Sequence, residues 1–597
     1  MNSLVDRKTL VDVAAGRRAP TMVVRNVSIV NTLSRELHRA IILVYQDRIA
    51  AILPETEVVP PAAIDIDGEG RFAVPGLIDP HMHTESSAVS LAEFARAVVP
   101  RGVTTIICDP HEYGNVVGRR GIELLLEEAK HIPLTVKLRV PPRVPEMTAD
   151  LESAGGALSY EDTLDLLDLP EAACLAGDIN PEFFLSNDSR HRALIDATIQ
   201  RRKTVSGFSQ ALTTRRLNAY VASGAEDSHA PEDVDEVIED IRHGLNVFLT
   251  PRPGMGMFDR ADFRILAERL AAKPFDTRRI CLCTDDIPAD RLITEGHLDY
   301  RLRMAIEEGI PPLVAIQMAT INPACAMRIE RDHGSISAGK FADFSLVDDL
   351  RAFSVTDTIY HGKHVVRAGE YLAPASPFKV PAWAKNTINL TATVSPKSLM
   401  ISVEPDAVEA DCNAVVKDQM KELQQITLPV VAGEVVCGND LDVVHVAVLD
   451  RYTGSGRIGK GFVLGTNIRH GALASTINHN AHNIFALGRS PEDMAVALNR
   501  VIEIGGGYVI VRDGVVVGEV KLPVIGMISE EPLEVVAEEL RKAEMAVHQY
   551  MGCEDSPQPL LSLSFFCAPV IPYVGITDMG PISTRTFLKE PTLIAAE

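Results

Sequence analysis

Near one end the chain reads Val74-Pro75-Gly76-Leu77-Ile78-Asp79-Pro80-His81-Met82-His83-Thr84-Glu85, and this stretch decides the fold. Residues 72–78 are mostly apolar, which predicts a short buried strand that ends at two histidines one residue apart. Because alternate side chains of a strand share a face, His81 and His83 are expected to point at one spot. Imidazole is the commonest side-chain ligand for transition metals, so the pattern favours a metal site over a pair of surface histidines beside a Pro-Gly turn.

Length and composition limit the class of protein. The chain has 597 residues, which at about 150 residues per domain predicts three or four folded units. Hydrophobic residues make up 46% of it, and the formal net charge of −23 disfavours binding to nucleic-acid phosphates. The nine cysteines form no Cys-x-x-Cys pair, and we find neither a signal peptide nor a run of about 18 apolar residues. We therefore expect a cytoplasmic protein with reduced thiols that binds neither nucleic acid nor a membrane.

Hydrophobic patterning divides the chain into four segments. Short strand-like runs separated by turn formers occupy residues 1–74, which predicts a small antiparallel sheet, and they return in residues 331–380 to complete a composite β-sandwich. Between them, residues 75–330 alternate apolar bursts with helical stretches, the pattern of a distorted (β/α)8 TIM barrel inserted in the sandwich. Residues 381–597 mix strands with helices and are expected to form an additional C-terminal α+β domain. The fold class is therefore α/β.

Polar residues directly follow the predicted barrel strands. His81 and His83 follow the first strand, and later bursts are followed by Asp109-Pro110-His111-Glu112, by Asp178 and by Asp285-Asp286. Because the active site of such a barrel lies at the C-terminal ends of its strands, one site is expected to gather them. The later bursts are Thr104–Cys108, Leu134–Leu138, Ala173–Ala176, Asn246–Leu249 and Ile280–Cys283.

Several longer stretches resemble the bacterial adenine deaminases, a family of the amidohydrolase superfamily of metal-dependent hydrolases. The resemblance covers nearly the whole chain, and several of these stretches are specific to that family. They are PGLIDPHMHTESS at 75–87, RGVTTIICDPHEYGNVVG at 101–118, RLNAYVASGAEDSH at 216–229, TDD at 284–286, EGHLDY at 295–300, ATINPA at 319–324, GSISAGKFADFSLV at 334–347 and, further on, DRYTGSGRIGKGFV, INHNAHNI and NRVIEIGGGYVIV.

The resemblance implies hydrolysis of adenine to hypoxanthine and ammonia, a step of purine salvage. It implies one or two divalent metal ions per chain, manganese(II) or iron(II) foremost and zinc(II) as the alternative. A bound divalent ion lowers the pKa of water, so that hydroxide can attack the purine C6 carbon. A carboxylate and a neighbouring imidazole can then carry protons to the ring nitrogen and the departing amine. The implied partner is a small molecule, adenine or a related purine base, and we expect a homo-oligomer.

The resemblance also assigns metal ligands and a catalytic base. His81 and His83 match the ligands of the first strand, and His229 matches a ligand of the sixth. Asp285 matches the last-strand aspartate, which in such sites touches metal and water together and accepts the proton. Asp178 aligns with the fourth-strand glutamate that bridges two metals. The alternatives are a helix N-cap for Asp285 and an ordinary loop position for His229.

Four further residues are expected near the substrate. Glu112 is predicted to be catalytic and His111 to contact the substrate, unless Asp109 merely stabilises their loop. His479 and His482 are three residues apart and can share one face. Because the C-terminal domain of the family lies near the barrel mouth, they are predicted to line the pocket; the alternative is a pair of structural histidines.

Five positions depart from the pattern of the family. Asp178 is one methylene shorter than the usual glutamate, Phe208 replaces a fifth-strand histidine, and Ile287 replaces a histidine after the Asp-Asp pair. Ala230 and Asn480 stand where carboxylates are usual. Because these changes remove possible ligands, the sequence allows either a one-metal site or a two-metal centre. They also motivate two alternative functions: an amidohydrolase acting on a different aminopurine or a cyclic amide, and a metal-poor, non-catalytic relative that binds a purine or a partner.

Overall fold

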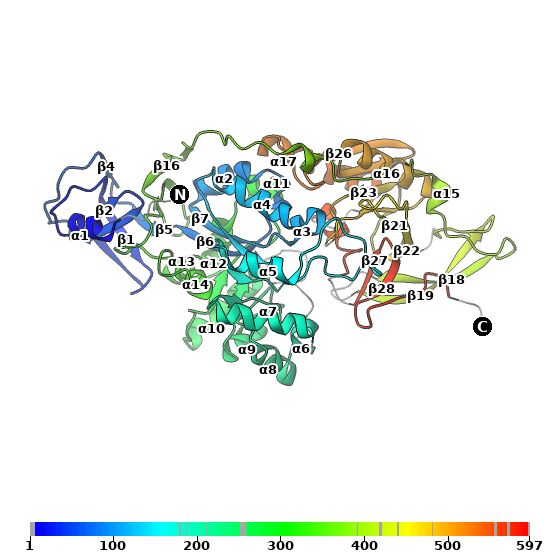
Figure 1. Ribbon diagram of the computed structural model, residues 1–597, viewed down its shortest axis with the longest axis horizontal. Helices are drawn as coiled ribbons and strands as arrows, with labels where there is room; N and C mark the ends of the chain where they lie inside the picture. Colours follow the sequence, from blue (N-terminus) through cyan, green and yellow to red (C-terminus); the bar gives the residue numbers. More distant parts are fainter. Residues whose placement is uncertain are drawn as a thin grey trace.

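A computed structural model gives the arrangement of the chain as three bodies in a row along its long axis (Figure 1). A small β body, drawn mainly in blue, is followed by the barrel in blue to green and by a C-terminal body in yellow to red. Within the described residues, no helix combines the length and the apolar character that crossing a membrane requires. The residues described are 6–177, 181–186, 188–210, 212–250, 258–390, 392–416, 421–438, 441–479, 481–553, 558–569 and 573–594.

The segments on either side of the barrel build one nine-stranded sheet in the order β17-β16-β15-β14-β5-β1-β2-β3, with β4 also paired to β1. The predicted antiparallel pairing holds for β1 and β2, but β4 and β5 pair parallel to β1. The difference arises because the chain crosses from one edge of the β1–β2 pair to the other after β3. The strands are β1 Met22–Asn31, β2 Glu36–Tyr45, β3 Arg48–Leu53, β4 Ile64–Asp67, β5 Phe72–Pro75, β14 Phe344–Val347, β15 Val355–Tyr360, β16 Lys363–Arg367 and β17 Glu370–Tyr371.

Alternation along β1 explains why both faces of this sheet are buried. Met22 belongs to a core cluster that includes Phe344 of the returning segment. Val23 points the other way, as period-two alternation requires, and packs in a second cluster with Val13 of helix α1, Arg7–Ala14. Two stretches separated by the whole barrel therefore share one hydrophobic core.

The barrel contains eight parallel strands among the described residues, in a five-stranded sheet, β10-β9-β8-β7-β6, and a three-stranded sheet, β11-β12-β13. At one junction the Glu226 amide donates to the Val205 carbonyl over 2.9 Å. At the other, Met82 and Asp285 form a parallel bridge. The predicted distorted (β/α)8 barrel is thus confirmed. Its strands are β6 Leu77–Met82, β7 Val103–Cys108, β8 Thr135–Val140, β9 Ala172–Leu175, β10 Thr204–Val205, β11 Asp227–His229, β12 Asn246–Leu249 and β13 Ile280–Leu282.

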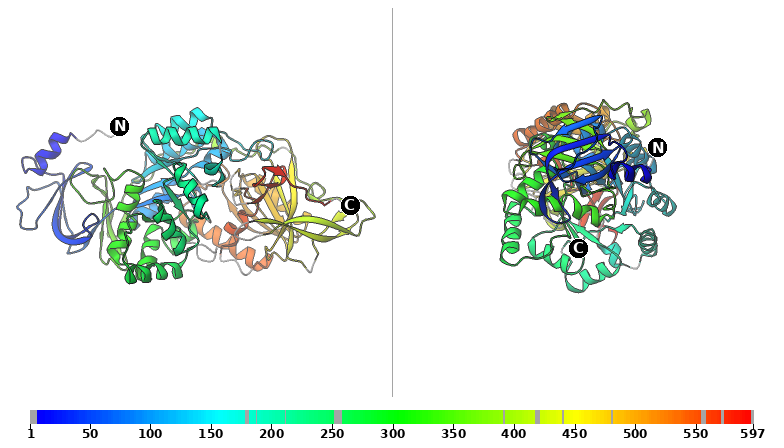
Figure 2. Two further views of the ribbon diagram at one scale, coloured as in Figure 1. Left: turned by 90° about the horizontal axis from the view of Figure 1, so that it is seen from below. Right: turned by 90° about the vertical axis from the view of Figure 1, so that its left-hand side faces the viewer.

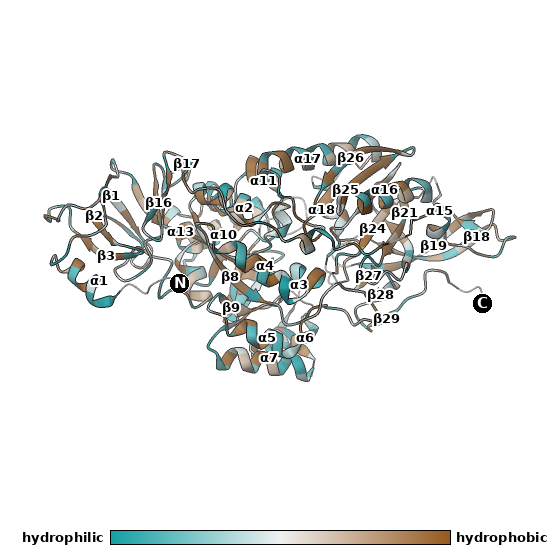
Figure 3. Ribbon diagram, turned by 45° about the horizontal axis from the view of Figure 1, so that its top comes forward, coloured by the Kyte–Doolittle hydropathy of each residue, from teal (hydrophilic) through white to brown (hydrophobic). Residues whose placement is uncertain are grey.

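Helices cover the outside of these strands (Figure 2). Helix α2 shows the local reason: the Ser90 side chain accepts from the Glu93 amide at its start, and Leu91, Phe94 and Val98 lie on its buried face. In Figure 3 the exposed helices α5 and α7 carry both teal and brown, as amphipathic helices do. The α-helices are α2 Leu91–Val98, α3 His111–Val117, α4 Arg119–Ala129, α5 Tyr160–Leu167, α6 Glu182–Leu185, α7 Ser189–Gln200, α8 Thr214–Ala222, α9 Val234–Arg242, α10 Arg260–Ala272, α11 Ala289–Thr294, α12 Leu298–Glu307, α13 Pro312–Met318 and α14 Ile321–Ala326.

The C-terminal body is built on a second nine-stranded sheet, in the order β20-β19-β18-β22-β21-β24-β23-β25-β26, and on a three-stranded sheet, β27-β28-β29. Helix α16 packs on β23, β24 and β25, and helix α17 packs on β26 and on α11 of the barrel. The elements are α15 Pro396–Leu399, β18 Glu409–Val416, β19 Glu422–Val431, β20 Glu434–Val435, β21 Val443–Leu449, β22 Ile458–Leu464, β23 Ala472–Ser475, β24 Ile484–Gly488, α16 Pro491–Ile504, β25 Gly507–Arg512, β26 Val515–Lys521, α17 Leu533–Ala546, α18 Pro559–Ser564, β27 Val574–Thr577, β28 Gly580–Ser583 and β29 Leu588–Lys589.

Phe344→Ala tests the shared core of the composite sheet. The ring is fully buried, so its removal leaves a cavity between the two distant segments and is expected to lower the free energy of unfolding by about 3–5 kcal/mol. Urea unfolding followed by circular dichroism measures the change. Phe587→Ala, at a ring that is 40% exposed, is the matched control and should cost far less. Equal effects of the two substitutions would contradict the shared core.

Candidate active site

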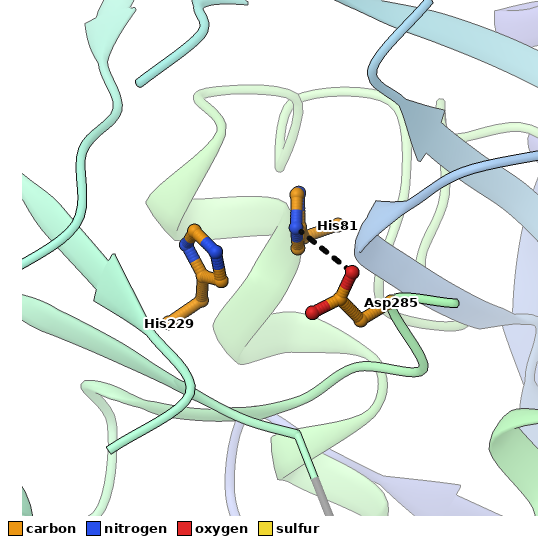
Figure 4. Close-up of side chains that lie close together, drawn as sticks. All are labelled: His81, His229 and Asp285. Atoms are coloured by element: carbon orange, nitrogen blue, oxygen red, sulfur yellow. Dashed lines mark ion pairs between the residues drawn. The ribbon is translucent and has the colours of Figure 1, made fainter. Parts of the chain in front are cut away.

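The first and last barrel strands bring two histidines and an aspartate together. The Nε2 atom of His81 lies 3.5 Å from Oδ1 of Asp285, and Nε2 of His83 lies 3.4 Å from the same oxygen. All three side chains are buried. Figure 4 shows His81 and Asp285 facing one another, with His229 beside them. The expected convergence of the His-x-His pair on one spot is therefore present in the structure.

The backbone of Asp285 aims its carboxylate into the barrel. Its φ is +58°, in the left-handed region that costs a residue other than glycine roughly 1 kcal/mol. The Asp285 amide donates to the carbonyl of His81 over 3.1 Å, which fixes this conformation. Helix α11 begins at Ala289 with Pro288 at its N-cap. Asp285 is therefore not the helix cap that the sequence allowed as an alternative.

His229, at the end of β11, completes a group of potential ligands. Its ring centroid lies 4.2 Å from that of His81, and its Nδ1 lies 3.3 Å from the carbonyl oxygen of Gly207. A hydrogen bond to that carbonyl fixes the ring orientation in the way that ligand histidines are commonly held. Ligand atoms of His81, His229 and Asp285 lie within 4.8 Å of one another. Imidazole nitrogen and carboxylate oxygen suit divalent manganese, iron or zinc, so the donors fit the expected metal.

A second group of possible ligands shares Asp285. Ligand atoms of His83, Asp285 and Asp286 also lie within 4.8 Å of one another. The hydroxyl of Ser86 donates to Oδ1 of Asp286, which orients that carboxylate. The sequence interpretation gave Asp286 no role, although it lies in the Asp-Asp pair, because a strand pattern does not show which of two adjacent carboxylates turns inward.

Three of the five positions that depart from the family pattern lie within the described residues. Asp178 and Asn480 lie outside the described residues. The ring of Phe208 lies 5.1 Å from that of His229 and is an apolar neighbour of this ligand candidate. Ile287 and Ala230 are buried. Among the described departures, each side chain packs and none supplies a ligand atom.

Glu112 joins the barrel to the C-terminal body. Its Oε1 lies 3.2 Å from Nε2 of His111 and 2.6 Å from Nδ1 of His479, and its Oε2 contacts Nε2 of His482. His111 begins helix α3 and also contacts Asp109, whose Oδ1 lies 3.0 Å from its Nδ1. The two later histidines come from the loop after β23. The structure thus gathers all four residues that the sequence placed near the substrate.

The electrostatics of this cluster favour a charged carboxylate. Burial raises the pKa of Glu112, but the three imidazoles outweigh burial and hold the pKa well below its ordinary value. Burial lowers the pKa of His111, but the charges of Glu112 and Asp109 outweigh it and raise that pKa well above its ordinary value. For His482, burial prevails and lowers the pKa. These pKa directions favour an ionised Glu112 next to a protonated His111.

Two buried polar residues, Asp79 and Arg139, contact the residues that form the site. Asp79 accepts a hydrogen bond from the Thr284 hydroxyl over 2.6 Å and one from the His81 amide over 3.2 Å, so it links the first and last strand ends. Burial raises the pKa of Asp79 to about 7. Arg139 is fully buried, with Nε 3.9 Å from Oδ2 of Asp109. A signal for Arg139 was present in the sequence, since a charged residue between apolar neighbours in a predicted strand needs a partner.

A pocket opens beside the candidate metal ligands, between the barrel and the C-terminal body. Glu85, Ser86 and Asp286 line it from the barrel. Its opposite wall comes from residues more than 180 positions later in the chain, which no local pattern could have placed there. The residues of that wall include His479, Tyr508 and Met527.

The chain is similar to adenine deaminases over nearly its full length. Residues 72–203 and 208–365 match the amidohydrolase family, and residues 419–588 match the adenine deaminase C-terminal domain. Adenine deaminase 3 of Rhizobium meliloti (strain 1021) is 36% identical over 593 residues, 98% of each chain. An adenine deaminase of Clostridium botulinum (strain Loch Maree / Type A3) is 33% identical over 585 residues, 97% of this chain and 96% of that one.

Solved structures also align with part of the chain. Enamidase, a member of the amidohydrolase superfamily, aligns with a TM-score of 0.44 at 19% identity and covers 59% of this chain and 98% of its own. An adenosine deaminase from Xanthomonas campestris with bound zinc aligns with a TM-score of 0.44 at 14% identity, over 59% of this chain and 94% of its own.

Glu112→Ala tests the buried link between the two bodies. Removal of the carboxylate takes away the buried acceptor that His111, His479 and His482 share, so the free energy of unfolding is expected to fall by about 3–5 kcal/mol. Urea unfolding of the full chain measures the loss. Glu123→Ala breaks an exposed ion pair with Arg119 and should cost less than about 1 kcal/mol. A loss for Glu112→Ala no larger than that of the control would show that the cluster does not hold the bodies together.

Proposed function

The chain belongs to the adenine deaminase family, and we propose that it hydrolyses adenine to hypoxanthine and ammonia at a divalent metal ion. His81, His83, His229 and Asp285 are the proposed ligands, with Asp178 as a further one. The observation that carries the proposal is the convergence of the two first-strand imidazoles on one oxygen of Asp285. Relatives named adenine deaminase match both the barrel and the C-terminal body, so the whole chain supports the same activity.

The donor set supports the metal dependence of the reaction. When bound, a divalent metal lowers the pKa of water toward neutrality, so that hydroxide is available near pH 7. Two groups of possible ligands share Asp285, which supports one or two ions per chain. We propose manganese(II) or iron(II) as the natural metal, with zinc(II) as an alternative that imidazole and carboxylate ligands also accept.

The residues of the chain can account for the proton movements. As the water oxygen bonds to C6 of adenine, the Asp285 carboxylate accepts the proton that the water releases and passes it to the ring nitrogen. The bond from C6 to the exocyclic nitrogen then breaks, and the amine takes up a second proton and leaves as ammonia. The C6 hydroxyl loses its proton as the carbonyl of hypoxanthine forms, and this proton restores the donor. We propose that Glu112 is catalytic together with His111: the imidazolium of His111 donates the proton, and the Glu112 carboxylate, 3.2 Å from its Nε2, stabilises it. His479 and His482 are proposed to hold the substrate from the other side.

The pathway, the cellular location and the assembly of the protein are predictions. We propose a role in purine salvage, a cytoplasmic location and a homo-oligomeric assembly, each of which rests on the resemblance of the sequence to the family. Size-exclusion chromatography with light scattering checks the assembly.

Asp285→Asn tests the proposed base. The amide cannot accept the proton from water, so kcat for adenine should fall by roughly 10²–10⁴-fold. Ammonia release and hypoxanthine formation by the manganese-loaded protein measure the rate, and metal analysis shows whether the ion is retained. Asp276→Asn, at an exposed carboxylate, should leave kcat unchanged. Wild-type protein that releases no ammonia after loading with manganese, iron or zinc would refute the function itself.

Replacing the proposed ligands tests the metal site without reference to activity. His81→Ala and His229→Ala should each lower the number of divalent ions bound per chain, because each removes one imidazole from a buried donor set. Elemental analysis of the purified protein counts the ions. His131→Ala, at an exposed histidine, is the control and should bind as many ions as the wild type. Unchanged metal content in both ligand variants would exclude these residues as ligands.

A further inference from the structure

Two polar groups of the C-terminal body face the pocket without a hydrogen bond to any residue that the structure describes. Tyr508 on β25 and Glu544 on α17 both line it, opposite Asp286 of the barrel. Within the described ranges, neither the Tyr508 hydroxyl nor the Glu544 carboxylate makes a hydrogen bond or an ion pair. Polar groups in such partly buried positions normally have partners, so a pair without them at a pocket calls for a ligand.

The charges of two carboxylates act on Tyr508. Burial raises the pKa of Tyr508, and the charges of Glu544 and then of Asp286 raise it further. Burial also raises the pKa of Glu544, to about 7, and the charge of Asp290 adds to this effect. The charge of Arg291 lowers the pKa of Glu544, but burial and Asp290 outweigh it. Because Glu544 lines the pocket and makes no hydrogen bond to a described residue, its carboxylate is available to a ligand there.

The rest of the C-terminal wall is apolar. Ile477, Leu522 and Met527 line the pocket together with Leu560 of α18. An apolar wall with a few convergent polar groups is the usual form of a site for a flat heterocycle. Helix α17, which carries Glu544, packs against α11, which follows the Asp285-Asp286 pair by only a few residues. The pocket therefore extends from Asp286, a member of the second group of possible ligands, to Tyr508 and Glu544.

We propose that Tyr508 and Glu544 bind the five-membered-ring edge of the purine and are the residues that distinguish its ring N–H from a substituted nitrogen. This inference rests on the proposed function and specifies its substrate-binding residues. The six-membered ring must lie at the metal ligands, because C6 is the reacting carbon, so the imidazole edge points away from them. That edge carries one N–H donor and one bare nitrogen. Glu544 accepts from the N–H, and the Tyr508 hydroxyl donates to the bare nitrogen.

Two substrates that differ only at this edge test the proposal. In 9-methyladenine a methyl group replaces the ring N–H, so the bond to Glu544 cannot form. We expect wild-type kcat/KM to be at least roughly tenfold higher for adenine than for 9-methyladenine, as the loss of a hydrogen bond to a charged group implies. In Glu544→Ala the ratio should fall toward one, because the group that detects the N–H is gone. Glu544→Gln retains an acceptor oxygen and should keep part of the preference.

Tyr508→Phe tests the second contact. Loss of the hydroxyl should raise KM for adenine by roughly tenfold with little change in kcat, and should weaken competitive inhibition by hypoxanthine to a similar degree. Glu538→Gln, on the exposed face of the same helix, and Tyr550→Phe are the matched controls. Metal content and melting temperature of each variant show that the site and the fold are retained.

The outcomes separate this inference from the proposed function. One outcome is that the wild type deaminates adenine while Glu544→Ala keeps the wild-type preference for adenine over 9-methyladenine within twofold. In that case Glu544 does not bind the N–H of the five-membered ring. If Tyr508→Phe has the wild-type KM and the same inhibition by hypoxanthine, the hydroxyl does not bind the base. If the metal-loaded wild type neither deaminates adenine nor binds hypoxanthine, the proposed function fails and this inference fails with it.

Discussion

The pairing of the last barrel strand with the first is the contact on which the site depends. Met82 and Asp285 form the bridge that closes this junction, and the Asp285 amide bonds to the carbonyl of His81. Because parallel strands present all their carboxyl ends at one edge, closure brings residues some 200 positions apart within reach of one ion. The left-handed backbone of Asp285 is tolerated because this bridge and the buried Asp79 hold the strand ends in place.

A second constraint is the cost of burying a charge. Glu112 lies at the barrel mouth, and a buried carboxylate needs partners of opposite charge or hydrogen-bond donors. Part of that need is met by His479 and His482, which belong to the C-terminal body. The C-terminal body is therefore fixed over the mouth by the same group that positions His111. Its packing there also supplies the wall that carries Tyr508 and Glu544.

The sequence predicted most of the barrel and less of its closure. The apolar bursts of the sequence correspond to β7, β8, β9, β12 and β13. The hydrophobic pattern did not show strands β10 and β11, because Thr204–Val205 and Asp227–His229 are too short to show a period; only the family resemblance placed His229 on a sixth strand. The parallel pairing of β4 and β5 with β1 was also missed, since pairing direction depends on where the chain crosses and not on the alternation of residues.

The sequence by itself determined that His81 and His83 share a face at the end of a buried strand, because that follows from the two-residue period of a strand. It also identified Asp285 and His229 through their resemblance to a family. Only the tertiary structure decided that Glu112 is enclosed by imidazoles from both bodies and that Tyr508 and Glu544 line one pocket with Asp286. The physical reason is distance along the chain. The two-residue period of a strand fixes the face on which a side chain lies, whereas the packing of distant segments fixes which residues it contacts.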